Sequence, residues 1–138
     1  MRIRLGEARV GRLATVAPDG QPHLVPCCFA LRGDTVYSAV DGKPKSTRAL
    51  RRLENIRANA RVALLVDFYN DEWDELWWVR VDANGRVLNS DDAATDDGAH
   101  AEFNFAVDLL RGKYEQYRVE APAGPVVALD IVQWRGWP

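Results

Sequence analysis

Short apolar runs alternate with tight turns over residues 1–40, and this feature limits the possible folds more than any other. Pro18-Asp19-Gly20 and Arg32-Gly33-Asp34 separate runs that are rich in apolar and β-branched residues. Because proline presets φ and glycine accepts a positive φ, both tripeptides are typical of reverse turns. Strands joined by such short turns pair with their neighbours in the chain. The sequence therefore predicts an antiparallel meander over residues 10–16, 23–31 and 35–40.

The second of these runs contains Pro26 and two adjacent cysteines, Cys27 and Cys28. Proline has no N–H to donate to a sheet, so we expect Pro26 at an edge or a bulge. Neighbouring residues of a strand point to opposite faces, so a bridge between the two cysteines would be strained. Free thiols suggest a reducing compartment, and buried small side chains are the preferred interpretation of both cysteines. The only histidines are His23 and His100, which gives no zinc-binding spacing and no metal site.

The spacing of apolar residues changes in the next segment. From Ser46 to about Ala58 the apolar residues recur on one helical stripe, at Ala49, Leu50, Leu53 and Ile56. Pro44 precedes this segment, and Ser46 or Thr47 can cap it. The pattern predicts one amphipathic helix over these residues.

Residues 61–69 are apolar and β-branched or aromatic at their centre, which is typical of a strand buried on both faces. Residues 76–83 alternate apolar and polar side chains. The dipeptide Asn84-Gly85 that follows predicts a hairpin turn into a further strand at 86–88.

The remaining segments are an acidic stretch at 89–98, a helical pattern at 101–110 and a β-prone run at 126–134. We expect the acidic stretch to be a loop, and the helix to turn inward Phe105, Leu109 and Ala106. Six or seven mostly antiparallel strands with two helices predict a mainly β protein with some α structure, a small barrel whose ends the helices cover.

The length of 138 residues is that of one ordinary domain, which we expect to span 1–138 without help from disulfides or metals. No apolar run approaches the roughly 20 residues that cross a bilayer, and the basic N-terminus is not followed by a hydrophobic stretch. The formal net charge is −2, which argues against nucleic acid or a membrane surface as the partner. We therefore expect a cytoplasmic protein.

The balanced net charge hides two segments of opposite sign. Residues 43–61 hold seven Lys and Arg and the single acid Glu54, whereas residues 67–108 hold twelve acids and two arginines. The basic segment coincides with the start of the predicted helix, where unpaired backbone N–H groups and the helix dipole favour an anion. A phosphate is the expected ligand there. A solvated helix face explains the same composition equally well, whereas nucleic acid is disfavoured because aromatic residues are not interleaved with the charges.

Several segments, in this order, resemble the pyridoxamine 5′-phosphate oxidase-like split β-barrel family that binds flavins and deazaflavins. They are Leu13-Ala14-Thr15-Val16, Asp19-Gly20-Gln21-Pro22-His23-Leu24-Val25-Pro26, Val36-Tyr37-Ser38, Lys45-Ser46-Thr47-Arg48-Ala49-Leu50, and Asn59-Ala60-Arg61-Val62-Ala63-Leu64-Leu65-Val66-Asp67. Leu76-Trp77-Trp78-Val79-Arg80-Val81 and the closing Trp134-Arg135-Gly136-Trp137 are similar to its branch of F420-dependent oxidoreductases.

The resemblance implies a six-stranded antiparallel split β-barrel with two or three helices, and a homodimer with cofactor grooves at its interface. The implied cofactor is coenzyme F420, with FMN as the alternative. Its phosphate would lie at Lys45, Ser46, Thr47 and Arg48, with Lys43 nearby. Its ring would run along Val25, Pro26 and Cys27, and Trp77 and Trp78 would shape the acceptor pocket.

Two functions remain open at this point. One is an oxidoreductase in which the cofactor transfers a hydride to or from a small organic substrate, with no catalytic side chain of the protein. The other is a non-catalytic protein that stores or carries a flavin, F420 or another phosphorylated ligand. His23 could donate a proton, but a lone histidine on a strand is more often structural.

Overall fold

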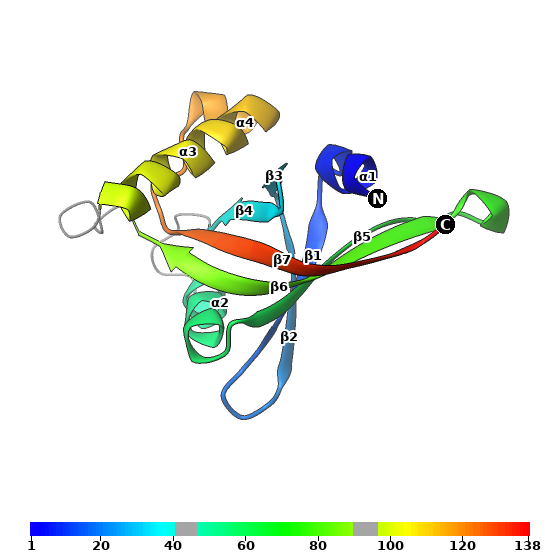
Figure 1. The fold of residues 1–138 in the computed structure, drawn as a ribbon, viewed down its shortest axis with the longest axis horizontal. Coiled ribbons are helices and arrows are strands. Elements are labelled where there is room, and N and C mark those ends of the chain that lie inside the picture. Colours follow the sequence, from blue (N-terminus) through cyan, green and yellow to red (C-terminus); the bar gives the residue numbers. More distant parts are fainter. Residues whose placement is uncertain (41–46, 90–96) are drawn as a thin grey trace.

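The computed structural model describes the backbone of residues 1–40, 47–89 and 97–138, and the side chains of these residues except 47–50 and 97. Seven strands and four α-helices make up this part of the chain (Figure 1). In chain order they are α1 (Arg2–Glu7), β1 (Gly11–Val16), β2 (Pro22–Cys27), β3 (Ala30–Arg32), β4 (Thr35–Ala39), α2 (Thr47–Ala58), β5 (Arg61–Phe68), the 3-10 helix η1 (Trp73–Glu75), β6 (Trp77–Leu88), α3 (Asp97–Lys113), α4 (Glu115–Val119) and β7 (Val126–Trp137).

All strands form one antiparallel sheet in the order β2-β1-β5-β6-β7-β4-β3. The sheet curls around its inner face, and the long strands β6 and β7 run through its middle (Figure 1). A register shift between Asp82 and Ala83 marks an irregularity where these two strands pair. The mainly β antiparallel barrel expected from the sequence is confirmed, but with seven strands in place of six and, in the described residues, four α-helices in place of two or three. Pro26 lies on β2, an edge strand of this sheet, as expected.

The extra strand arises because the predicted run over 23–31 is divided in two. β2 pairs with β1, whereas β3 pairs with β4 at the opposite edge of the sheet. Between them, the backbone of Phe29 bonds to side chains: its N–H donates to Tyr114 Oη (3.0 Å), and its carbonyl accepts from Lys113 Nζ (2.8 Å). These distant partners satisfy the Phe29 backbone groups, so the chain can leave one strand pair and enter another.

The hairpin predicted at Asn84-Gly85 is wrong, because β6 continues through both residues to Leu88. Gly85 N–H donates to Ala60 O at 2.7 Å. A Cβ on Gly85 would lie 3.0 Å from Ile56 Cγ2, so the glycine allows α2 to approach the strand closely. The dipeptide Asn84-Gly85 therefore marks close packing of the strand against α2, and not a turn.

The helix predicted at 46–58 is confirmed as α2. The helix predicted at 101–110 is present as the longer α3, but its inward face is partly wrong. Phe103, Ala106 and Leu110 are buried, whereas Phe105 is 40% exposed and contacts Tyr37 edge-on at 6.1 Å between ring centroids. The short helices α1 and α4 were not predicted, because six and five residues are too few to show a helical period.

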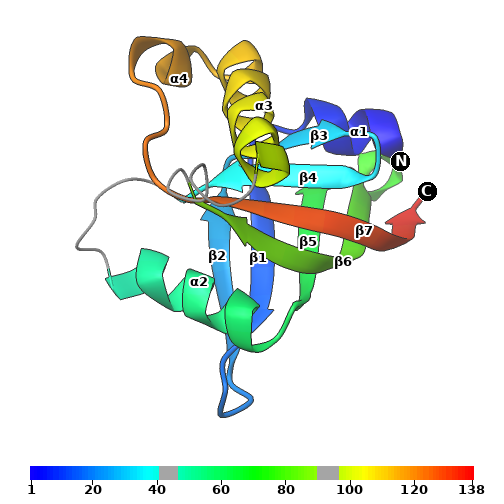
Figure 2. The same cartoon turned by 60° about the vertical axis from the view of Figure 1, so that its left-hand side comes forward.

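Two hydrophobic clusters lie on the two sides of the sheet. The inner cluster includes side chains of β1, β5, β6 and α2, among them Leu13, Leu53 and Leu64. The outer cluster forms where α3 packs on β4 and on the adjoining parts of β6 and β7 (Figure 2). The outer face of β2, β1, β5 and the first half of β6 has no described helix packed on it, and we refer to it as the bare outer face.

Candidate functional site

Helix α2 packs on the inner side of the barrel beside β1 and β6 (Figure 2). Leu53 and Ile56 enter the inner cluster, as their helical spacing predicts. Between them on the helix, Asn55 Nδ2 donates to Thr15 Oγ1 of β1 at 3.1 Å, and both residues are 1% exposed. A buried hydrogen bond between two polar side chains fixes the position of the helix on the strand.

Thr15 pairs in register with His23 of β2, so the two side chains share the inner face. Val25 and Cys27 follow on the same face of β2 because side chains alternate along a strand. Val25 packs against the inner cluster and Cys27 is buried within it, whereas Pro26 is exposed on the opposite face. Of the three β2 residues that the resemblance assigns to the cofactor ring, two therefore face the inner side of the barrel and one faces the opposite side.

The positive charge of Arg52 on α2 acts on the Cys27 thiol. Burial raises the pKa of Cys27, and a hydrogen bond with Ser38 and the Arg52 charge oppose this effect without cancelling it. The thiol is therefore neutral near pH 7 and is not an activated nucleophile. The Arg52 charge is thus within electrostatic reach of Cys27 on the inner face of β2.

Two buried nitrogen atoms in this region have no hydrogen-bond partner in the described part of the chain: Arg52 Nε and His23 Nδ1. A buried polar atom without a partner costs about 1–3 kcal/mol. Arg52 Nε is a donor, whereas His23 Nδ1 can donate or accept, depending on its tautomer. A ligand with polar groups between α2 and β2 would satisfy both atoms, so these residues fit a flavin-type cofactor.

The predicted phosphate segment falls largely outside this description. Lys43, Lys45 and Ser46 lie outside the described residues, and Thr47 and Arg48 are described only as backbone, at the start of α2. Further along the helix, the side chains of the basic residues are described, and Arg51, Arg52 and Arg57 form no ion pair within the described ranges. The helix thus carries positive charge that these residues do not neutralise.

The two tryptophans at the start of β6 point to different sides of the sheet. Trp77 packs against the inner cluster, and the Arg4 guanidinium stacks over its ring at 4.9 Å from the centroid. Trp78 lies beside Met1, Ile3 and Trp137. Because β1 and β5 separate β6 from β2 in the sheet, one chain does not bring Trp78 together with the inner-face residues Val25 and Cys27.

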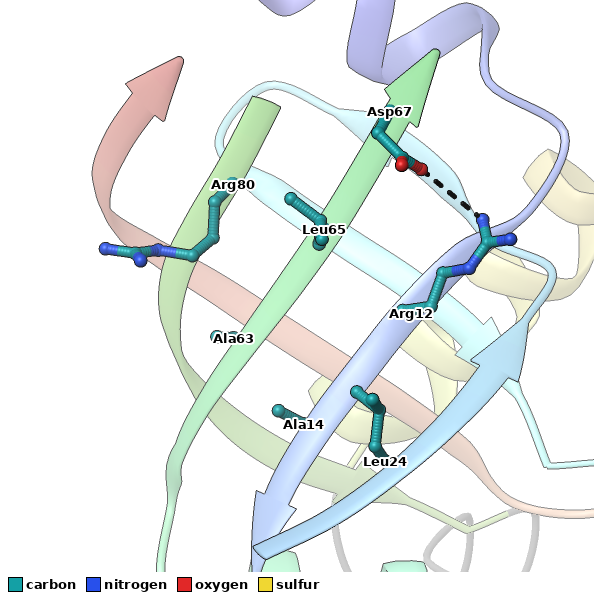
Figure 3. Close-up of a pocket in the computed structure, with 7 residues that line it drawn as sticks. All are labelled: Arg12, Ala14, Leu24, Ala63, Leu65, Asp67 and Arg80. Atoms are coloured by element: carbon teal, nitrogen blue, oxygen red, sulfur yellow. Dashed lines mark ion pairs between the residues drawn. The ribbon is translucent and has the colours of Figure 1, made fainter. Parts of the chain in front are cut away.

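The bare outer face carries a groove of about 310 Å³ (Figure 3). Two alanines and two leucines form much of its surface, and charged residues lie around them, with Arg12 and Asp67 forming an ion pair at 3.8 Å. A second ion pair joins Arg80 Nε to Asp82 at 3.1 Å. The groove is lined by Arg12, Ala14, Leu24, Ala63, Leu65, Asp67 and Arg80.

Sequence reasoning missed Arg52 and Asn55 as individual site residues. Arg52 was visible only as part of a basic segment, although it falls one helical turn after Arg48. A polar Asn55 between the apolar positions Leu53 and Ile56 was the available signal for a buried hydrogen bond.

The sequence pattern of the pyridoxamine 5′-phosphate oxidase family matches residues 1–138. The chain belongs to this family. The family resemblance inferred from the ordered segments is therefore confirmed, while the F420-dependent branch is not established by this match. No curated protein matches the chain significantly.

Solved structures of other members of this fold are similar over nearly the whole chain. A conserved hypothetical protein of Mycobacterium tuberculosis has a TM-score of 0.70 and 22% identity, over 98% of this chain and 80% of its own. An FAD-binding protein of Mesorhizobium loti has a TM-score of 0.63 and 25% identity, over 98% and 89%. The FAD-binding protein of Mycobacterium smegmatis has a TM-score of 0.59 and 20% identity, over 96% and 87%. These similarities show that the chain shares the fold of these proteins.

Two further findings concern metals and membranes. Within the described ranges, no group of three or more His, Cys, Asp and Glu side chains is placed to hold a metal ion. Among the same residues, no helix has both the length and the apolar character needed to span a bilayer.

Proposed function

We propose that the chain is an oxidoreductase that binds F420, or alternatively FMN, at a homodimer interface. When bound, this cofactor would supply hydride transfer to or from a small organic substrate. The observation that carries the proposal is the positive charge of α2, which lies against the inner side of the barrel and has no ion-pair partner within the described residues. Membership of the family and the FAD-binding neighbours support a flavin-type ligand. The preference for F420 rests on the Leu76–Val81 and Trp134–Trp137 segments.

In this proposal the protein binds and orients, and the described residues near the ring include no activated nucleophile. Lys45, Ser46, Thr47 and Arg48 hold the phosphate, with Lys43 beside them, because helix N-termini and basic side chains both favour anions. Val25, Pro26 and Cys27 line the ring, and Val25 excludes water from its inner side.

A second copy of the chain would cover the bare outer face. Leu24 is 66% exposed there, which is unfavourable for an isolated chain. Small side chains such as Ala14 and Ala63 allow two sheets to approach closely. The partner subunit would then supply Trp77 or Trp78 to the acceptor pocket, which one chain does not assemble by itself.

Equilibrium titration with FMN and with F420 tests the proposal. We expect retention of one of them at micromolar concentration, and a loss of affinity of about 100-fold or more in Lys45→Ala/Arg48→Ala, because each charge-assisted hydrogen bond contributes roughly 1.5–3 kcal/mol. Arg32→Ala is the control, since Arg32 lies over Phe105 on the α3 side of the sheet.

Failure to retain either cofactor would reject the oxidoreductase. An unchanged affinity in the double variant would reject the phosphate assignment alone. Retention of the cofactor without reduction of any tested acceptor would favour a carrier or storage protein.

A further inference from the structure

Arg52 and His23 approach one point of the molecule from two elements. His23 pairs with Thr15 across β2 and β1, and Thr15 accepts the hydrogen bond from Asn55 of α2. Arg52 precedes Asn55 by three positions, so both side chains lie on the same side of the helix. The two unpartnered nitrogen atoms, Arg52 Nε and His23 Nδ1, therefore belong to residues that flank the Asn55–Thr15 hydrogen bond, one on the helix and one on the strand.

The burial of these atoms limits what can bind them. The unpartnered atom of Arg52 is Nε, at the stem of the guanidinium, and it is shielded from solvent. A ligand group that hydrogen-bonds to Arg52 Nε must therefore lose its own hydration. Transfer of a phosphate from water is far more costly than transfer of a neutral carbonyl. A neutral polar group that accepts from Arg52 is therefore the better match.

The position along the helix supports the same choice. The predicted phosphate residues end at Arg48, and Arg52 lies about 6 Å further along the helix axis at 1.5 Å per residue. The Arg52 charge acts on Cys27, one of the residues that the proposed function assigns to the ring. Arg52 therefore lies beyond the predicted phosphate residues, at a point on the helix where its charge acts on the strand assigned to the ring.

We propose that Arg52 and His23 bind the polar edge of the planar cofactor ring, where carbonyl acceptors flank an N–H donor. Arg52 donates Nε–H to a ring carbonyl, and His23 Nδ1 bonds to the neighbouring ring group. The inference rests on the proposed function, and it assigns two residues to ring binding that act separately from the phosphate segment.

The test compares ligands that share the ring but differ in the phosphate. Dissociation constants of FMN and riboflavin, and of F420 and its phosphate-free deazaflavin riboside, are measured by fluorescence with the wild-type chain and with Arg52→Gln. We expect Arg52→Gln to weaken both members of the retained pair by the same factor, about 10- to 100-fold. Lys45→Ala/Arg48→Ala should weaken only the phosphorylated member. The control is Arg32→Gln, an exposed arginine that lies over Phe105 on the α3 side of the sheet, which should leave all constants unchanged.

Further variants distinguish a loss of ligand binding from a change in folding. Arg52→Lys keeps the charge but lacks Nε–H, so we expect it to weaken ring binding almost as much as Arg52→Gln does. His23→Leu should weaken both members about 3- to 10-fold, as expected for one neutral hydrogen bond. Unchanged melting temperatures show that these losses concern the ligand.

The outcomes separate this inference from the proposed function. If the wild-type chain retains no member of either pair, the proposed function fails and the inference fails with it. If the wild-type chain binds but Arg52→Gln weakens only the phosphorylated ligand, or neither ligand, the inference alone is overturned. Wild-type affinity for the phosphorylated ligand in Arg52→Lys would likewise identify Arg52 as a general positive charge near the phosphate.

Discussion

The outer face of the sheet has two halves, of which one is buried under α3 and the other is exposed. In the half under α3, Tyr37, Ala39, Leu88, Val126 and Ala128 are at most 6% exposed. In the bare half, the side chains around the groove include small residues, the exposed Leu24 and two ion pairs. One sheet thus buries one half of its outer face by itself and leaves the other half open.

The composition of the two halves shows why they differ. The covered half presents buried apolar side chains that fit the stripe of Phe103, Ala106 and Leu110 on α3. The bare half presents alanines between paired charges, which is a surface that tolerates water but also accepts a flat partner. The covered half therefore contributes to the stability of one chain, and the bare half is suited to association.

The largest effect that we expect concerns the covered half. Leu110 of α3 is fully buried against the sheet, and Leu110→Ala should lower the free energy of unfolding by about 2–5 kcal/mol. Leu24→Ala on the bare half should cost less than about 0.5 kcal/mol in a dilute sample, because Leu24 is 66% exposed.

Denaturant unfolding at several protein concentrations checks the contrast. Association adds stability by mass action, so the cost of Leu24→Ala should grow with concentration, whereas the cost of Leu110→Ala should not. A cost of Leu24→Ala that is independent of concentration would mean that no second copy covers the bare half.

The next prediction concerns the bare half directly. Ala63 lies on the surface of the groove in β5, and Ala63→Arg would place a long charged side chain where we expect a second sheet. The dissociation constant of the dimer should rise by at least 100-fold, while the monomer stays folded. Sedimentation velocity measures the change.

Ala101→Arg is the matched control because Ala101 is exposed on α3, outside the bare half. If both variants sediment as the wild-type chain does, the bare half is not the dimer interface. A wild-type chain that is monomeric at high concentration would contradict the homodimer itself.

The comparison also shows how far sequence patterns predict the fold. Alternation located the strands, and the helical spacing of Leu53 and Ile56 located α2, because both patterns record which side of an element is buried. The inward face of α3 was wrong at Phe105, since that ring lies at the margin of the helix–sheet contact, edge-on to Tyr37. The turn at Asn84-Gly85 was wrong because Gly85 is required by the approach of α2, a contact that local sequence does not show.

The same limit of sequence patterns applies to the candidate site. The strand that we propose for the ring could be located from the ordered segments, since Val25 and Cys27 lie on a regular strand and face inward. The proposed role of Arg52 could not, because it rests on an unpartnered atom, and partners are defined only when α2 is packed against β1 and β6.

The smallest expected effect concerns the ion pairs of the two halves. In the covered half, Arg86 binds Glu102 of α3 at 2.7 Å and Asp130 of β7 at 2.7 Å, and Tyr37 Oη donates to Glu102 at 2.8 Å. In the bare half, Arg12 and Asp67 are 3.8 Å apart. The first is a close network that holds the helix to the sheet, and the second is a loose pair on the surface.

The hydrogen bond from Arg86 holds the pKa of Glu102 below its usual value. The carboxylate therefore contributes stability above the unfolded pKa of about 4.5, and this contribution is lost as the pH falls through the folded pKa.

Arg86→Gln should lower the free energy of unfolding at pH 7 by about 0.5–1 kcal/mol, a modest value because the Arg86 side chain is 41% exposed. It should also flatten the fall in stability between about pH 4.5 and pH 3. Asp67→Asn should change the stability of the monomer by less than about 0.3 kcal/mol and leave the fall in stability at low pH unchanged. Thermal melts from pH 3 to pH 7 in the Ala63→Arg background measure the effect of each variant on stability and on its pH dependence. If both variants flatten the fall in stability at low pH equally, the close network of the covered half holds α3 no better than the loose surface pair does.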